Sequence, residues 1–145
     1  MKAKTKKADM IVNPELKDHL KVKKGIYGFG LFTTVPIKKG TFIIQYVGKM
    51  LTSDEANEKG GQYLFEINSR WTIDGTERTN TARYINHSCR PNCESDTDER
   101  KKKVYISAIK NIKAGEELCY DYGKSFWKEY IKPKGCRCAK CQEKK

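Results

Sequence analysis

The apolar residues of this chain come in short runs rich in β-branched and aromatic side chains, and turn-forming residues separate these runs. TFIIQYVG at 41–48 has the composition of a strand, and VYISAI at 104–109 alternates as a strand does. YLFEI at 63–67 and WTID at 71–74 are close enough in sequence to form a hairpin. IKAGEEL at 112–118 indicates a turn that leads into a short strand. Because the short strands are many and the helical periodicity is slight, we predict a mostly-β domain.

The sequence predicts very little helix. Thr52 is followed three residues later by Glu55, which fits a capping box for one short helix over about 53–59. Two glycines, Gly60 and Gly61, would end that helix. SFWKEYI at 125–131 has the composition of a single helical turn.

The charge of the chain is unevenly distributed. Its 145 residues are the length of one domain, and they carry a formal net charge of +12. Residues 1–24 hold eight lysines against three acids, residues 124–145 hold eight basic residues against two acids, and residues 25–123 hold fourteen against thirteen. Two basic ends therefore flank a near-neutral middle, which indicates either contact with a polyanion such as nucleic acid or solubilising lysine tails.

The sequence offers no signal for a membrane or for secretion. No apolar run approaches the roughly 18–20 residues of a membrane span, and the lysine-rich start lacks the apolar stretch of a signal peptide. We therefore expect no membrane partner. Without a secretion signal, metal ligation or free thiols are favoured over disulfides for the six cysteines.

Three cysteines, Cys136, Cys138 and Cys141, lie within six residues near the end of the chain. Such close neighbours are poorly placed for a disulfide with each other but well placed to face one small ion. Zinc takes four ligands in a tetrahedron, so this cluster predicts a structural zinc site with a fourth ligand from elsewhere. The alternative is a reactive or incidental cysteine tail. The candidates for the fourth ligand are Cys89, Cys93, Cys119, His19 and His87.

Two polar blocks carry most of the remaining chemistry, RYINHSCRPNC at 83–93 and GEELCYDYG at 115–123. Polar loop residues at this density are unsuited to a hydrophobic core, which favours a functional role for them. A hydrolytic Cys–His pair would need His87 to activate Cys89, whose surroundings do not single it out as a nucleophile. Ser88 lacks a separate histidine ordered by an aspartate, since the chain has only two histidines. A hydrolase is therefore disfavoured.

Four blocks in order along the chain resemble the SET domain of protein-lysine methyltransferases. GFGLF at 28–32 resembles the family's GxG block; it lacks the third glycine and the βαβ context of a dinucleotide-binding fingerprint. Residues 83–92 resemble the RFxNHSCxPN block, and 116–122 resemble the EELxYDY block. The cysteine tail resembles a post-SET zinc module. The resemblance covers about residues 21–142, and each block adds to the specificity of the others.

The chain departs from the family pattern at two places. Only two residues separate Cys138 from Cys141, whereas the family's usual tail has four, so zinc ligation is open to alteration. Arg90 lies where many members carry an acid or a neutral residue. The chain has no cysteine-rich pre-SET region and resembles a minimal version of the family.

The resemblance implies a SET fold, in which several small β-sheets surround a C-terminal pseudoknot and a cysteine-rich post-SET segment follows. It divides the chain into a basic N-terminal arm at 1–20, a SET domain at 21–124 and a post-SET zinc-binding tail at 125–145. The pseudoknot would bring residues 86–93 together with residues 120–122.

The resemblance also implies the site. S-adenosylmethionine and the substrate lysine would enter from opposite faces and meet in a narrow channel. Tyr122 would be the catalytic tyrosine, Tyr63 the second channel tyrosine, and Tyr120 the position that limits the methylation degree, favouring mono- or dimethylation. The residues implied for the methyl donor are Gly28, Phe29, Gly30, Arg83, Asn86, His87, Tyr122 and Trp127, with Trp127 stacking on adenine. Those implied for structural Zn²⁺ are Cys89, Cys136, Cys138 and Cys141.

The implied function is a protein-lysine N-methyltransferase that acts on a basic protein tail, most readily a histone. The basic ends would contact nucleosomal DNA, and the location would be the nucleus and its chromatin, or a host nucleus for a viral or bacterial protein. Two alternatives stay open: a catalytically silent, zinc-stapled module that binds histone or DNA, and a methyltransferase of a non-histone basic protein.

Overall fold

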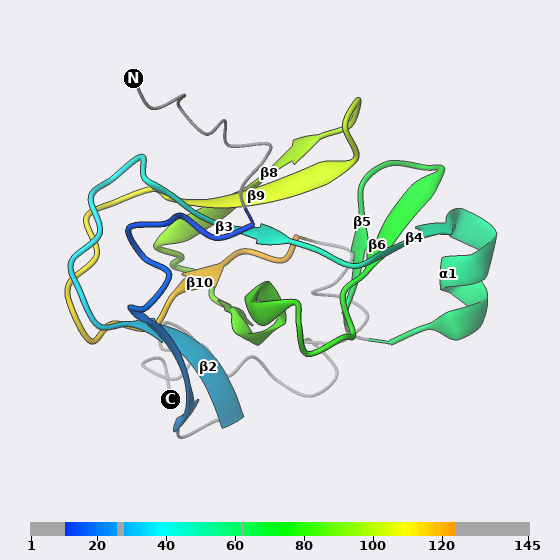
Figure 1. Cartoon of the computed structure of the whole chain (residues 1–145). Coiled ribbons are helices and arrows are strands. Elements are labelled where there is room, and N and C mark those ends of the chain that lie inside the picture. The colour runs from blue at the N-terminus through cyan, green and yellow to red at the C-terminus, as the bar shows by residue number, and fades with distance from the viewer. Residues whose placement is uncertain (1–10, 26–27, 62, 124–145) are drawn as a thin grey trace.

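A computed structural model of the chain describes residues 11–25, 28–61 and 63–123. Within these ranges the chain forms small sheets of two or three strands, with one short α-helix at the end of the molecule drawn at the right of Figure 1. The predicted mostly-β domain is thereby confirmed. No helix in the described part of the chain is long and apolar enough to span a membrane.

The first sheet is an antiparallel hairpin of β1 (Leu20–Gly25) and β2 (Gly28–Thr33), which the sequence analysis did not predict. Gly28 begins β2 with φ of 110°, a conformation that favours glycine. Leu31 in β2 is fully buried, and its carbonyl accepts the N–H of Leu118 at 2.8 Å. The hairpin is therefore fixed to the polar block at 115–123.

The central sheet has the order β3-β9-β8 and is antiparallel throughout. It consists of β3 (Phe42–Tyr46), β9 (Lys103–Ala108) and β8 (Cys93–Asp98), so the strands predicted around 41–48 and 104–109 are both present. The core lies against this sheet, and its largest fully buried apolar side chains are Leu31, Ile43, Ile44, Ile85, Val104, Ile106, Ile112 and Leu118.

The third sheet has the order β4-β6-β5, formed by β4 (Lys49–Thr52), β6 (Trp71–Asp74) and β5 (Leu64–Glu66). The predicted hairpin of residues 63–74 is confirmed as the antiparallel pair β5–β6. The strand predicted over 41–48 is shorter than expected, because β3 ends at Tyr46 and the chain begins a new strand in this sheet at Lys49.

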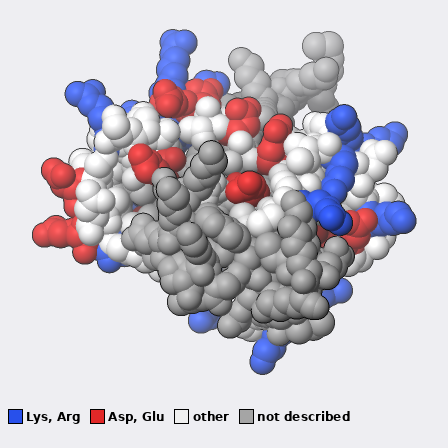
Figure 2. Space-filling model, turned by 180° about the vertical axis from the view of Figure 1, so that it is seen from behind, with Lys and Arg blue, Asp and Glu red and all other residues white. Residues whose placement is uncertain are grey.

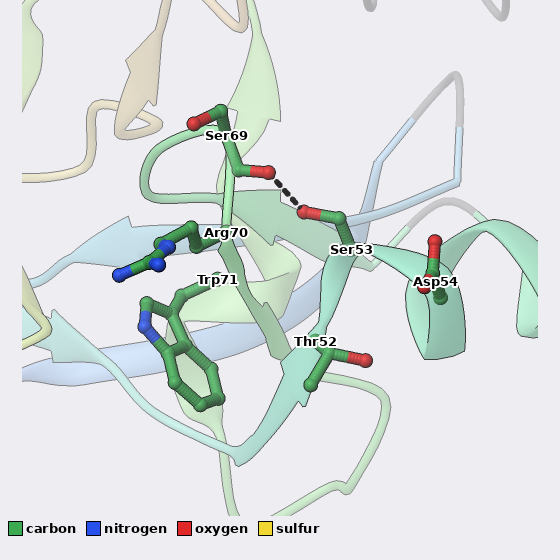
Figure 3. A pocket seen from close by; sticks show the side chains of 6 residues that line it. All are labelled: Thr52, Ser53, Asp54, Ser69, Arg70 and Trp71. Atoms are coloured by element: carbon green, nitrogen blue, oxygen red, sulfur yellow. Dashed lines mark hydrogen bonds between the residues drawn. The ribbon is translucent and has the colours of Figure 1, made fainter.

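The helix α1 (Ser53–Lys59) begins as predicted. Thr52 Oγ1 accepts the N–H of Glu55 at 3.2 Å, and the Glu55 carboxylate accepts the N–H of Thr52 at 3.0 Å, which completes the capping box. The Ser53 hydroxyl donates to the carbonyl of Ser69, so the start of the helix is also fixed to the turn between β5 and β6 (Figure 3).

Part of the segment assigned to the N-terminal arm packs on the domain. The N–H of Asn13 donates to the carbonyl of Ile43 at 2.9 Å, and the N–H of Gln45 donates to the carbonyl of Ile11 at 2.7 Å. Leu16 is 5% exposed and belongs to the core. The described part of the arm therefore belongs to the folded domain and packs beside β3, because its apolar residues are buried there. Residues 1–10 lie outside the described ranges.

Three short elements carry the polar blocks. The 3₁₀ helix η2 (Thr81–Tyr84) precedes β7 (Asn86–His87), and β10 (Cys119–Tyr120) lies beside β7 in a parallel pair. Figure 1 shows β10 near the middle of the molecule, between the first hairpin and the central sheet. The predicted helical turn at 125–131 lies outside the described residues.

Candidate active site

The two polar blocks meet where β7 and β10 pair. Cys119 lies opposite Asn86, and Tyr120 lies opposite His87. The N–H of Ser88 donates to the carbonyl of Tyr120 at 3.1 Å, which continues the pairing beyond the strands. Residues about thirty positions apart in sequence thus share one short parallel ladder at the centre of the domain.

A buried amide holds this junction together. Asn92 is 5% exposed. Its Nδ2 donates to the carbonyl of Glu117 at 2.9 Å, and its Oδ1 accepts the N–H of Cys119 at 2.9 Å. The sequence analysis quoted Asn92 in its block but gave it no role, because nothing local shows that its partners lie in the other block.

Tyrosines gather beside the junction. The rings of Tyr120 and Tyr122 lie 4.9 Å apart between centroids, and Tyr120 is 4% exposed. The Tyr122 hydroxyl donates to the carbonyl of Ile85, and the Tyr46 hydroxyl donates to the carbonyl of Tyr63 at 2.7 Å. The three tyrosines predicted as catalytic therefore lie with a fourth, Tyr46, which the sequence analysis assigned only to a strand.

Burial keeps these phenols protonated. Desolvation raises the pKa of Tyr46, Tyr120 and Tyr122 above the ordinary phenol value, and the neighbouring tyrosines raise each pKa further. At neutral pH all three side chains are neutral hydroxyls that donate and accept hydrogen bonds. None of them is available as a general base.

His87 is held in one tautomer. Its Nδ1 accepts the N–H of Tyr122 at 3.1 Å, and burial lowers the pKa of the ring. A neutral imidazole that accepts at Nδ1 carries its proton on Nε2, which lies 3.4 Å from Cys89 Sγ. The Asp121 carboxylate lies 3.8 Å from Nδ1, but an ion pair there would need a proton on the nitrogen that already accepts from Tyr122. We therefore assign His87 a neutral, accepting Nδ1.

The GxG block lies against Asn86. Nδ2 of Asn86 donates to the carbonyl of Phe29 at 2.9 Å and to Glu117 Oε2 at 2.7 Å. The Phe29 side chain is 57% exposed and meets the Tyr84 ring edge to face at 6.4 Å between centroids. The sequence analysis assigned no role to the Glu117 side chain, because its hydrogen-bond partner Asn86 lies in the other polar block.

Arg83, predicted to contact the methyl donor, is engaged by aromatic rings. Its guanidinium carbon lies 4.2 Å from the centroid of Tyr63 and 5.1 Å from that of Tyr84, and it donates to the carbonyl of Thr76. Its buried Nε has no hydrogen-bond partner among the described residues. Arg83 thus joins the tyrosine cluster to the aromatic surface beside Phe29.

Of the four predicted zinc ligands, only Cys89 belongs to the described residues; Cys136, Cys138 and Cys141 lie outside them, as does Trp127. The described ranges contain no group of three or more histidine, cysteine, aspartate or glutamate side chains that could hold a metal ion. Cys93 is buried, and desolvation raises the pKa of its thiol to about 12, which disfavours the thiolate that zinc requires.

An open hollow lies at the other end of the molecule, beside α1 (Figure 3). It contains none of the residues of the polar blocks, and we assign it no part in the chemistry of the site. Its lining consists of Thr52, Ser53, Asp54, Ser69, Arg70 and Trp71.

The SET domain family profile matches residues 28–123, which include both polar blocks and the GxG block. Histone-lysine N-methyltransferase ATXR7 of Arabidopsis thaliana is 38% identical over 130 residues, which is 79% of this chain and 9% of that protein. Histone-lysine N-methyltransferase trithorax of Drosophila virilis is 36% identical over 138 residues, 88% of this chain and 4% of that protein. Histone-lysine N-methyltransferase 2D of Homo sapiens is 36% identical over 81% of this chain and 2% of its own length. This chain thus spans only a small part of these relatives, and it belongs to the SET-domain family.

Proposed function

We propose that this chain is an S-adenosylmethionine-dependent protein-lysine N-methyltransferase whose substrate is a histone. The observation that carries the proposal is the tyrosine cluster beside the β7–β10 junction. Tyr122 and Tyr120 lie in contact there, and His87 accepts the N–H of Tyr122. The histone-lysine methyltransferase names of the relatives support the same conclusion.

The reaction requires a neutral lysine amine. The ordinary pKa of lysine is about 10.4, so deprotonation at pH 8 costs about 3 kcal/mol. An apolar channel lowers the pKa of a lysine by desolvation, and aromatic rings hold its ammonium form before the proton leaves. Tyr63, Tyr120 and Tyr122 would supply these walls. When bound, S-adenosylmethionine supplies an electrophilic methyl group on a sulfonium.

Tyr122 would position the amine and would not remove its proton. Because the pKa of Tyr122 is raised, its hydroxyl stays protonated, and it donates to the carbonyl of Ile85. Its oxygen could then accept an N–H of the substrate amine, which must lie about 3–3.5 Å from the methyl carbon and in line with it. The buried Tyr120 hydroxyl would limit the room for added methyl groups, which favours mono- or dimethylation.

The GxG face fits a nucleoside cofactor. Gly28 has open space where a Cβ would be, and the exposed Phe29 ring offers an apolar surface. Asn86 presents a hydrogen-bonding amide next to that surface, pre-set by Phe29 and Glu117. Gly30, Arg83, His87, Tyr122 and Trp127 would complete the donor site.

Structural zinc would be held by Cys89 together with Cys136, Cys138 and Cys141. Cys89 fits this role because Nε2 of His87 carries a proton and lies 3.4 Å from Sγ, where it favours a thiolate. A site closed by four thiolates would be structural, and it would fix the tail beside the donor site.

A basic protein tail fits the charges of the chain. Figure 2 shows carboxylates gathered across the upper part of the back face among white residues, with lysines and arginines at its edges. Carboxylates favour the approach of a lysine-rich peptide. The basic termini of the chain would contact nucleosomal DNA, and chromatin in the nucleus would be the place of action.

The proposal is tested by incubating the purified chain with labelled S-adenosylmethionine and, separately, intact nucleosomes, free histones and a non-histone basic protein. We expect label on a histone lysine, with the modified residue and its methylation degree read by mass spectrometry. Label on the non-histone protein alone would replace the histone substrate by that class. Donor binding without transfer to any substrate would favour the catalytically silent binding module.

A further inference from the structure

Glu117 and Gly30 form an arrangement that the sequence blocks do not explain. The Glu117 carboxylate occupies the space where a side chain on Gly30 would begin: an ideal Cβ on Gly30 would lie 2.8 Å from Glu117 Cδ and closer still to Oε2. Gly30 does not have the positive φ that its neighbour Gly28 has. Gly28 therefore suits its backbone conformation, whereas Gly30 leaves a space that the Glu117 carboxylate occupies and that a side chain at position 30 would take from it.

That carboxylate determines the orientation of the Asn86 amide. Nδ2 of Asn86 has two hydrogens, and it donates them to the Phe29 carbonyl and to Glu117 Oε2. Neither of these oxygens has a hydrogen to donate in return. The opposite orientation would place Oδ1 against two oxygens. Oδ1 is consequently left as an acceptor on an exposed side chain, and no donor among the described residues bonds to it.

The Asn86 Oδ1 can accept from any hydrogen-bond donor, and the Glu117 carboxylate beside it favours a donor that carries a positive charge. The methyl donor has two cationic groups, a sulfonium without hydrogens on sulfur and an α-ammonium with three N–H donors. Hydrogen bonds with a charged partner are among the stronger ones, and the nearby carboxylate favours a positive charge. Of the two cations, only the α-ammonium can bond to Oδ1.

We propose that Glu117 is a positioning residue for the methyl donor: it orients the Asn86 amide so that Oδ1 accepts from the donor's α-ammonium, and Gly30 is glycine to make room for it. This inference rests on the proposed function. It differs from a direct role of Gly30 in admitting the cofactor, because it predicts that the effect of a side chain at position 30 depends on Glu117.

The first test compares two ligands by calorimetry on the full chain: S-adenosylhomocysteine, which carries the α-ammonium, and 5′-methylthioadenosine, which lacks the amino acid. Glu117→Ala should weaken the binding of S-adenosylhomocysteine by about tenfold or more. It should leave the dissociation constant of 5′-methylthioadenosine within about twofold of that of the unaltered chain. Glu117→Gln, which keeps an acceptor oxygen, should recover most of the loss. Glu116→Ala is the matched control, since the exposed Glu116 carboxylate accepts the N–H of Lys113 and no other donor among the described residues.

The second test is a double-mutant cycle. Gly30→Ala should weaken the binding of S-adenosylhomocysteine, because the new side chain displaces Glu117. The double variant Gly30→Ala with Glu117→Ala should bind this ligand no more weakly than Glu117→Ala alone. Equal losses for both ligands, no loss in Glu117→Ala, or no recovery in Glu117→Gln would overturn the inference, as would additive effects in the cycle. If the unaltered chain binds neither ligand, the proposed function fails first and the inference falls with it.

Discussion

Replacement of Asn92 by alanine should destabilise the domain more than replacement of any exposed asparagine. The substitution removes the only side-chain partners shown for two backbone groups in the junction, the carbonyl of Glu117 and the N–H of Cys119, each at 2.9 Å. A buried polar group left without its partner costs about 1–3 kcal/mol. The two groups together predict a loss of about 2–6 kcal/mol, a large part of the stability of an ordinary domain.

Urea denaturation measures this loss directly. With a slope of about 2 kcal/mol per molar urea, the urea midpoint of Asn92→Ala should fall by about 1–3 M. The matched control is Asn111→Ala, because Asn111 is an exposed asparagine whose Oδ1 accepts one backbone N–H, that of Lys39, at 2.9 Å. We expect the control variant to lose less than about 1 kcal/mol of unfolding free energy. Similar losses in the two variants would refute the account of Asn92 as the amide that holds the blocks together.

Three further predictions concern stability and thiol chemistry. Gly48→Ala should destabilise the domain by about 1–3 kcal/mol in urea, since an ideal Cβ there would lie 2.6 Å from the Asp74 carbonyl carbon. Burial raises the pKa of the Asp74 carboxyl, but hydrogen bonds from Lys59 and Thr76 outweigh it and lower the pKa overall. The stability that the Asp74 carboxylate contributes should thus be present above about pH 4 and be lost as the pH falls through its lowered pKa. Asp74→Asn should therefore make the urea midpoint less dependent on pH in that range. Cys93, with a pKa of about 12, should resist iodoacetamide at pH 8 until urea unfolds the chain, as mass spectrometry of the labelled peptide would show; labelling in the folded chain would contradict its burial.

Local signals predicted the parts of the fold that depend on neighbours in sequence. The capping box of Thr52 and Glu55 needs only four consecutive residues, and the hairpin of 63–74 needs one turn. Strand β9 was predicted from the alternation in VYISAI at 104–109, which is also a local pattern. In contrast, β7 and β10 are two residues each, and no local pattern reveals a parallel pair so short and so distant in sequence.

The family blocks predicted which residues lie near one another, whereas contacts that depend on packing between the blocks could not be predicted. Tyr120 and Tyr122 lie together as their block implied. Glu117 stands in that same block, but its side chain acquires a partner only when Asn86 and Gly30 are brought beside it. Sequence alone also cannot distinguish a glycine kept for its conformation from one kept for space.

We propose that the tyrosine cluster positions a lysine amine for methyl transfer, and the rate of that transfer tests the proposal most directly. The measurement is the initial rate of label incorporation from S-adenosylmethionine into nucleosomes by the unaltered chain, by Tyr122→Phe and by Tyr105→Phe. Tyr105 is a buried tyrosine of β9 that packs on Phe42 outside the cluster, so its variant removes the same atom elsewhere. We predict that Tyr122→Phe lowers the rate by about 10²-fold or more while Tyr105→Phe keeps most of it. Equal rates for the unaltered chain and Tyr122→Phe would contradict the account.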